Sequence, residues 1–310
     1  MRISSMSVPA ALLLLAAAVS AAPVNLAIKF PAGQVDKFAM TMDMDQTLTS
    51  DALPTPQKQK IKMGMDMLLK VLESDDKGAK VEMTFDRMSV SMSMFNQEMA
   101  FDSAKDKPAA SNPLSAIGTI VGAKLTLHFT PGGKVDKVEG VDDVVKKLSA
   151  QPGAAGAGAG QMLKQMMSEE QIKQTFNSGF AETLPGKPVD IGDTWESNVS
   201  QNVNGMAMKM KSENKLVAVE VQGGHKIAKI EFSGDGKLEG APAGGPKVKM
   251  DQMTQKGTKL FDLDRGTFSQ TDMEQKMKGS MTVPTPNGDV ALKMDQSLNA
   301  KITMKPVEAK

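Results

Sequence analysis

Methionine at every second position is the sequence feature with the clearest chemical potential. Met40, Met42 and Met44 alternate with polar residues. Thioethers are soft ligands that suit Cu(I), and side chains two residues apart on a strand point to the same face. The same sulfurs are also adaptable apolar groups that fill a core or line a surface able to repack around different guests. The sequence therefore leaves a metal site and an apolar face as alternatives.

Groups that could support catalysis are few. The two histidines, His128 and His225, lie outside any nucleophile, metal-helix or acid-pair motif, so we expect structural or surface roles. The absence of cysteine and tyrosine removes thiol, phenol and most zinc chemistry. Asp262 and Asp264 before Gly266 resemble part of a calcium loop, but the later acidic ligand is missing, so a plain turn is predicted. We expect a protein that is not an enzyme and that uses no cofactor.

Residues 1–21 have the pattern of an export signal. Arg2 precedes an apolar run, and the segment ends in small residues at Ala21. The run is too short to span a bilayer comfortably, and there is no cysteine to carry a lipid. We therefore expect a periplasmic or secreted protein with a cleaved signal peptide and no transmembrane anchor.

The charge balance argues against polyanionic partners. Without Arg2 the mature chain has 36 basic and 36 acidic residues. Such a chain has no long-range field that would recruit nucleic acid or an anionic membrane. The remaining partner class is a hydrophobic small molecule or lipid, and the sequence indicates no particular protein partner.

Apolar residues recur with a period of two along most of the mature chain. The longest run covers residues 290–304, where only Gln296 interrupts the apolar row. This period excludes an amphipathic helix and predicts an antiparallel strand with one buried and one wet face. A strand of this length requires a tall, curved sheet. The predicted fold is mainly β, with long curved antiparallel sheets or a half-barrel and a few short helices.

The same period predicts further strands and one irregularity. Val217, Val219 and Val221 alternate in the second half of the chain, and a change of parity at residues 86–87 predicts a β-bulge. The five residues from Met44 recur from Met294, which suggests an internal repeat. One apolar face is predicted to be lined by Met42, Met44, Met65, Met67, Leu292 and Met294.

Helices are predicted between the strand blocks. They cover residues 114–121, 141–148 and 161–180; Ser168 and Gln171 form a capping box at which the last segment can divide into two helices. Residues 151–160 have the Gly/Ala composition of a flexible linker. We expect an N-terminal β lobe with short helices over residues 22–150, and a helix followed by a C-terminal antiparallel β lobe over residues 161–310.

The segment LPGKPVDIGDTW, residues 184–195, resembles an exported bacterial family of unknown function with an L-P-x-K-P-V-x-x-G-D-x-W signature. Similar phrases extend over most of the mature chain, and the resemblance implies no catalytic residues. Gly192 suits a tight turn, Asp193 can accept from nearby amides, and Trp195 is suited to anchor the entering strand. By fold analogy alone, the chain is similar to lipoprotein-carrier (LolA-like) half-barrels, in which a curved sheet holds acyl chains beneath short helices.

Three functional hypotheses follow. The first is a non-enzymatic exported protein that binds a hydrophobic ligand or lipid on the Met-lined concave face. The second is a Cu(I) or Ag(I) binding protein that uses Met40, Met42 and Met44. The third is an envelope module with a structural or interaction role.

Overall fold

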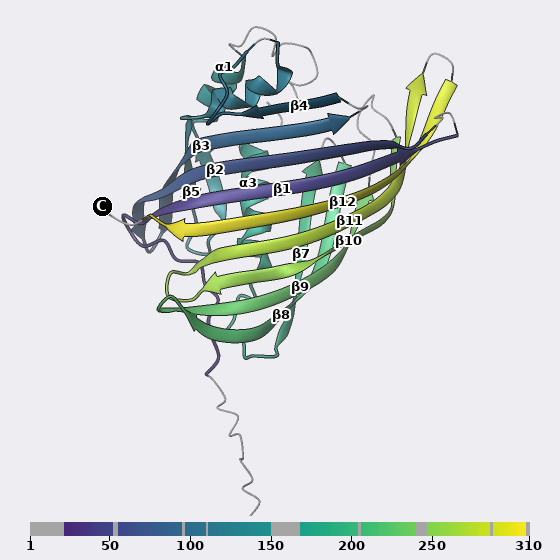
Figure 1. Ribbon diagram of the computed structural model, residues 1–310. Coiled ribbons are helices and arrows are strands. Elements are labelled where there is room, and N and C mark those ends of the chain that lie inside the picture. The colour runs from purple at the N-terminus through teal and green to yellow at the C-terminus, as the bar shows by residue number, and fades with distance from the viewer. Residues whose placement is uncertain are drawn as a thin grey trace, which may run out of the picture.

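The computed structural model describes residues 22–51, 55–94, 97–109, 111–149, 168–203, 206–239, 247–285 and 288–307. Within these ranges, twelve strands form one antiparallel sheet that does not close on itself (Figure 1). The strands are β1 Val35–Thr49, β2 Gln57–Asp75, β3 Gly78–Met94, β4 Gln97–Asp102, β5 Lys124–Phe129, β6 Val135–Glu139, β7 Thr194–Val203, β8 Met206–Gln222, β9 His225–Glu239, β10 Lys247–Asp262, β11 Thr267–Thr285 and β12 Gly288–Pro306. The mainly β prediction is confirmed. The predicted signal peptide (1–21), the linker (151–160) and residues 161–167 of the third predicted helix lie outside the described residues.

The first and last strands meet at the centre of the sheet. The strand order is β6-β5-β3-β2-β1-β12-β11-β10-β9-β8-β7, with β4 added beside β3. In Figure 1 the purple β1 lies beside the yellow β12. The two copies of the short repeat face each other across this pair, with Gln46 opposite Gln296 and Met44 opposite Leu298. Residues of both predicted lobes therefore contribute to one continuous sheet.

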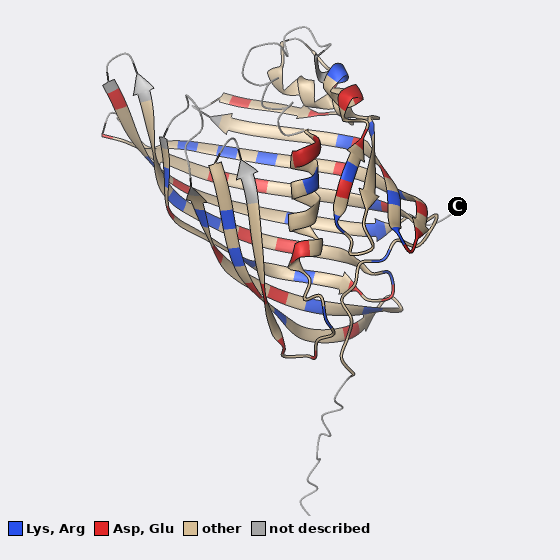
Figure 2. Ribbon diagram, turned by 180° about the vertical axis from the view of Figure 1, so that it is seen from behind, with Lys and Arg blue, Asp and Glu red and all other residues tan. Residues whose placement is uncertain are grey.

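The period of two separates the sheet into two chemically different faces. The inner face carries Phe38, Met40, Met42 and Met44 and packs against helix α3 (Glu169–Gly179). The outer face carries the intervening polar residues, which form ion pairs between strands, such as Lys62 Nζ to Asp43 Oδ1 at 3.5 Å. Figure 2 shows that acidic and basic residues occur along most strands. The solvated outer face thus consists largely of opposite charges on neighbouring strands.

Irregular pairing adjusts which side chains face inward. Arg87 pairs with Asp66 and Phe85 pairs with Met67, so Asp86 is the extra residue of the predicted bulge. A second register shift occurs in β8 between Leu216 and Ala218. It keeps both Leu216 and Val219 against the core, although they lie an odd number of residues apart. Val221, predicted to share the alternation, is 71% exposed at the end of the strand.

Glycines on the inner face make room for large side chains of the neighbouring strands. A Cβ at Gly236 would lie 2.4 Å from Met253 Sδ, and a Cβ at Gly257 would lie 2.7 Å from Phe232 Cζ. At Gly257 a Cβ would also overlap the Asp272 carbonyl oxygen, so this position requires glycine, whereas at Gly236 the flexible Met253 side chain would have to move. The large side chains of neighbouring strands occupy the space that the glycines leave.

The helices are short, as predicted, and two of them begin at side-chain caps. A 3-10 helix, η1 (Pro113–Ile120), starts after Asn112, whose side chain accepts from the Leu114 N–H at 3.0 Å. Helix α1 spans Val141–Ser149, and a short 3-10 turn, η2 (Ala181–Thr183), follows α3. Ser168 caps α3 by accepting from the Gln171 N–H at 3.3 Å, which confirms the predicted start of a helix at this position.

Helix α3 spans the opening between the two edges of the sheet (Figure 2). On the β6 side, Asn177 Oδ1 accepts from the Val135 N–H at 2.7 Å, and its amide donates to the Val135 carbonyl at 3.1 Å. Glu169 accepts from the Val138 N–H at 3.2 Å. On the other side the helix contacts β7. Side chains of α3 therefore satisfy backbone groups at one edge that would otherwise be open to pairing with another chain.

Two hydrophobic cores lie at the end of the inner face that α3 covers. The first joins inner-face residues of β1, β2, β3, β5 and β12 to Ile172 of α3. The second surrounds Trp195, Leu216 and Phe261. A series of ring contacts connects the two cores, through Phe30, Phe129, Phe176, Phe180, Phe268 and Phe261. This end of the sheet is therefore filled with side chains.

We predict that Asn177→Ala destabilises the fold by about 1–3 kcal/mol, because the Val135 backbone loses both of its partners on α3. Urea denaturation of the two proteins measures the difference. Thr175→Ala is the matched control, since the exposed Thr175 hydroxyl bonds only within the helix, to the Gln171 carbonyl. Equal losses in the two variants would contradict a role for Asn177 at the sheet edge.

Candidate functional site

The inner face continues beyond the two cores as an apolar surface. We call this surface the open half of the inner face. Its residues are half-buried, and none of them belongs to either core cluster of the described chain. They are Met42, Met44, Met63, Met273, Met277, Met281, Leu292, Met294 and Leu298. Register places them together, because Met42 pairs with Met63, Met273 pairs with Ala300, and Leu292 pairs with Met281.

The predicted ligand-lining residues divide between this surface and the core. Met42, Met44, Leu292 and Met294 lie on the open half. Met65 is half-buried and packs against the first core. Met67 is 3% exposed and belongs to that core, which also contains Ile172 of α3. The predicted residues thus share one face but not one environment.

The three methionines of the metal hypothesis also lie on the inner face. Met40 packs against the first core, whereas Met42 and Met44 are half-buried on the open half. Across β2, Met40 lies opposite Met65 and Met42 lies opposite Met63. Directly opposite residues have neighbouring Cβ atoms, so the register brings thioethers of two strands together.

Lys259 is an inner-face residue that the sequence analysis missed. In β10 it lies between Gly257 and Phe261, is 8% exposed, and has Ile230 and Thr271 as strand neighbours. Its Nζ lies 4.8 Å from the centroid of the Phe232 ring and 5.7 Å from that of Phe268. The alternation Met253, Gln255, Gly257, Lys259, Phe261 was the signal that could have revealed a lysine at an inward position.

Burial lowers the pKa of Lys259 to about 8. Desolvation disfavours the ammonium form, and the two aromatic rings offset this only in part. Among the described residues, no carboxylate forms an ion pair with Lys259 and no group accepts a hydrogen bond from it. It is also the only basic residue in the buried set of these residues.

Two hollows are less suited to a hydrophobic ligand. An apolar cavity of about 70 Å³ lies next to α3, between Phe176, Phe268 and Met304. Ligand pockets usually measure about 300–1,000 Å³, so this cavity is too small. A hollow of about 840 Å³ on the outer face is lined by charges that pair with one another, such as Lys256 and Glu274 at 3.2 Å.

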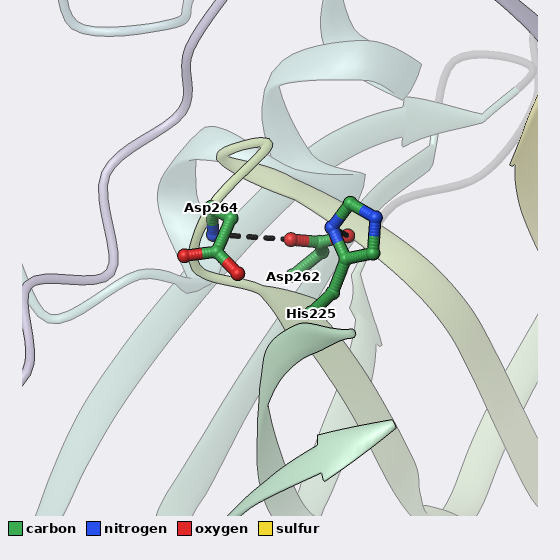
Figure 3. Close-up of side chains that lie close together, drawn as sticks. All are labelled: His225, Asp262 and Asp264. Carbon is green, nitrogen blue, oxygen red and sulfur yellow. Dashed lines mark hydrogen bonds and ion pairs between the residues drawn. The ribbon is translucent and has the colours of Figure 1, made fainter. Parts of the chain in front are cut away.

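His225, Asp262 and Asp264 form the one cluster of potential metal-ligating side chains found in the described residues (Figure 3). Their ligand atoms lie within 4.8 Å of one another. Asp262 Oδ1 accepts from the N–H groups of Asp264, at 3.0 Å, and Arg265, at 2.9 Å. Its Oδ2 lies 3.2 Å from His225 Nδ1, and Asp264 Oδ2 accepts from the Lys226 N–H at 2.8 Å. The carboxylates hold the β10–β11 turn against the start of β9, which agrees with the predicted plain turn.

The same turn is tied to the centre of the sheet by Arg265. Its guanidinium forms an ion pair with Asp36 at the start of β1, and both side chains are largely buried. The other histidine, His128, lies on β5 with its Nε2 3.2 Å from Glu139 Oε1 on β6.

The signature segment forms a structural corner, as its residues predict. Gly192 has φ +101°, a conformation that other residues rarely adopt. Asp193 accepts from the Asp190 N–H at 2.9 Å. The buried Trp195 ring donates from Nε1 to the Thr183 carbonyl at 2.9 Å and so connects β7 with the segment after α3.

Sequence comparison places this chain in a family. The model of a family of unknown function (DUF6263) matches residues 76–288. The chain belongs to this family. No curated protein matches the sequence.

Solved structures with a related arrangement are distant from this family member. A structure titled for lipid–protein interactions in lipovitellin has a TM-score of 0.43 and 8% identity, covering 91% of this chain and 26% of that chain. The β domain of the Bordetella autotransporter BrkA has a TM-score of 0.24 and 9% identity, and the match covers 87% of this chain and 98% of that chain. An outer membrane channel from Pseudomonas putida F1 has a TM-score of 0.20 and 6% identity, and the match covers 90% of this chain and 97% of that chain. The chain thus spans about a quarter of lipovitellin, and at these scores the likenesses carry no argument about function.

The helices of the described residues are all too short or too polar to cross a membrane.

We predict that Lys259→Met raises the free energy of unfolding at neutral pH by about 3 kcal/mol, because the variant no longer buries a charge. In the native protein, the folded pKa of about 8 lies below the ordinary 10.5, so the unfolded chain binds more protons between these values. Wild-type stability should rise with pH across that window, and the variant should lack this rise.

Urea denaturation at pH 7 and at about pH 10 measures both effects. Lys256→Met, on the outer face of the same strand, is the control and should leave the pH dependence unchanged. A wild-type stability that is flat across the window would show that Lys259 is not desolvated.

Proposed function

We propose that this protein is a non-enzymatic exported protein that binds a hydrophobic ligand, such as the acyl chain of a lipid, on the open half of the inner face. The observation that carries the proposal is the group of half-buried methionine and leucine side chains on the open half that neither core includes; Gln46, Gln275 and Gln296 share this face with them. Contiguous apolar surface of this kind commonly marks a binding site.

The composition of the surface suits guests of variable shape. Methionine is unbranched and has three rotatable bonds, so a methionine-lined wall repacks around different chains. Gly257 and Gly279 interrupt the large side chains on the same face. Helix α3 and the cores fill one end, so a bound chain would extend from there along the strands.

A binding role agrees better than catalysis with the titratable groups. In the part of the chain that the structure describes, the His225, Asp262 and Asp264 side chains stabilise a turn rather than face the open half. His128 pairs with Glu139 at the edge of the sheet. These contacts give each group a structural role.

Native mass spectrometry after mild extraction should show a retained lipid, and the delipidated protein should take up a fluorescent fatty acid. Met294→Asp places a charge on the open half and should weaken uptake at least about tenfold, because the carboxylate would be desolvated by the bound chain. Lys293→Asp changes the exposed outer-face neighbour and should have no effect. A ligand-free mass together with no uptake would refute the proposal.

A second candidate is supported by the register of the methionines. The pairs Met40–Met65 and Met42–Met63 place soft donors of adjacent strands opposite each other, as a thioether site for Cu(I) or Ag(I) needs. Anaerobic titration with Cu(I) should then show tight binding that the triple change of Met40, Met42 and Met44 to Leu weakens. Unchanged affinity in this variant would exclude the stripe as a metal site. Failure of both ligands, with a partner protein co-purifying, would favour an envelope interaction module.

A further inference from the structure

Lys259 combines deep burial with the lack of a charged partner. Its side chain is enclosed on β10 between Phe232 and Phe268, and no carboxylate of the described residues pairs with it. Arg265, which is also largely buried, has Asp36 as its partner. An unpaired buried charge is unfavourable, and perturbed groups of this kind concentrate at functional sites.

The position of Lys259 connects it to the open half. Across β11 and β12, its row of inner-face residues continues through Thr271 and Ile302. The next row begins at Gly257 and continues through Met273 and Ala300 to Met42. Gly257 has no side chain, and the Phe232 ring beside the Lys259 ammonium group lies over it. The ammonium group therefore lies at the boundary between the filled end and the open half.

We propose that Lys259 binds the carboxylate of a long-chain fatty acid whose acyl chain lies along the open half of the inner face. This inference rests on the proposed function and names the class of its ligand. The apolar row would receive the chain, and the ammonium group would donate to the carboxylate at the covered end. Pairing would compensate the desolvation of both ions.

A single negative charge matches the site better than a phosphate group. Lys259 is the sole basic residue in the buried set of the described chain, and the Arg265 guanidinium is already neutralised by Asp36. Phosphate recognition usually recruits several cations, Arg forks or clustered backbone N–H groups. One ammonium group between aromatic rings is suited to a ligand head group with a single negative charge.

Calorimetric titration of the delipidated full chain with palmitate, hexadecanol, acetate and a lysophosphatidic acid tests the proposal. A hydrogen bond to a charged group contributes roughly tenfold to a hundredfold in affinity. Wild type should therefore bind palmitate at least about tenfold more tightly than hexadecanol, and acetate should not compete at the same concentration. Lys259→Met should reduce palmitate affinity to that of hexadecanol while leaving hexadecanol binding intact, which also shows that the variant is folded. Lys259→Arg should retain most of the preference, and Lys256→Met should retain all of it.

The outcomes separate this inference from the proposed function. Equal binding of palmitate and hexadecanol by wild type, or unchanged palmitate affinity in Lys259→Met, would overturn the role of Lys259 and leave the hydrophobic site standing. Binding of neither palmitate nor hexadecanol by wild type would overturn both. Competition by acetate would show a free-anion site, and tighter binding of a lysophosphatidic acid than of palmitate would overturn the assignment of the head as a carboxylate.

Discussion

A sheet that curls without closing has two edges, and the rest of this structure depends on how α3 occupies the space between them. Asn177 and Glu169 accept hydrogen bonds from backbone N–H groups of β6, and Asn177 also donates one to a backbone carbonyl of that strand. The other side of the helix contacts β7. The apolar side chains of α3 point into the first core, through Ile172 and Phe176. One helix thus completes an edge and fills one end of the inner face. The other end is left as the half-buried methionine surface.

The two faces have opposite requirements, and both are met within the same strands. Outer-face charges pair between strands near water, where each pair contributes little to stability. The inner face has large apolar side chains and glycines that make room for them, so that Met253 and Phe232 lie over Gly236 and Gly257. Lys259 departs from this pattern, and the desolvation of its ammonium group opposes folding. Residues that reduce stability without a structural benefit are frequently retained for function.

Much of the local structure could be predicted from the sequence, because it depends on neighbouring residues. The period of two predicted the strands, and the change of parity predicted the bulge at Asp86. The capping residue Ser168 predicted the start of α3. Pairing of β1 with β12 depends on residues far apart in sequence, and only a five-residue repeat pointed to it. Which methionines are enclosed depends on where α3 lies, so Met67 and Met42 could not be distinguished. Lys259 was readable in the alternation of β10, but a lysine is usually assigned to the wet face.

The meeting of β1 and β12 at the middle of the sheet also affects how the molecule can assemble. The central seam joins residues 36–49 to residues 293–306, so it cannot form until β12 is available. Each half can pair its own strands earlier, through local hairpins, but would expose the long edge that belongs to the seam. Loss of β12 would remove a central strand rather than a peripheral one. Of the twelve described strands, the one latest in the sequence is therefore the one that joins the two halves of the sheet.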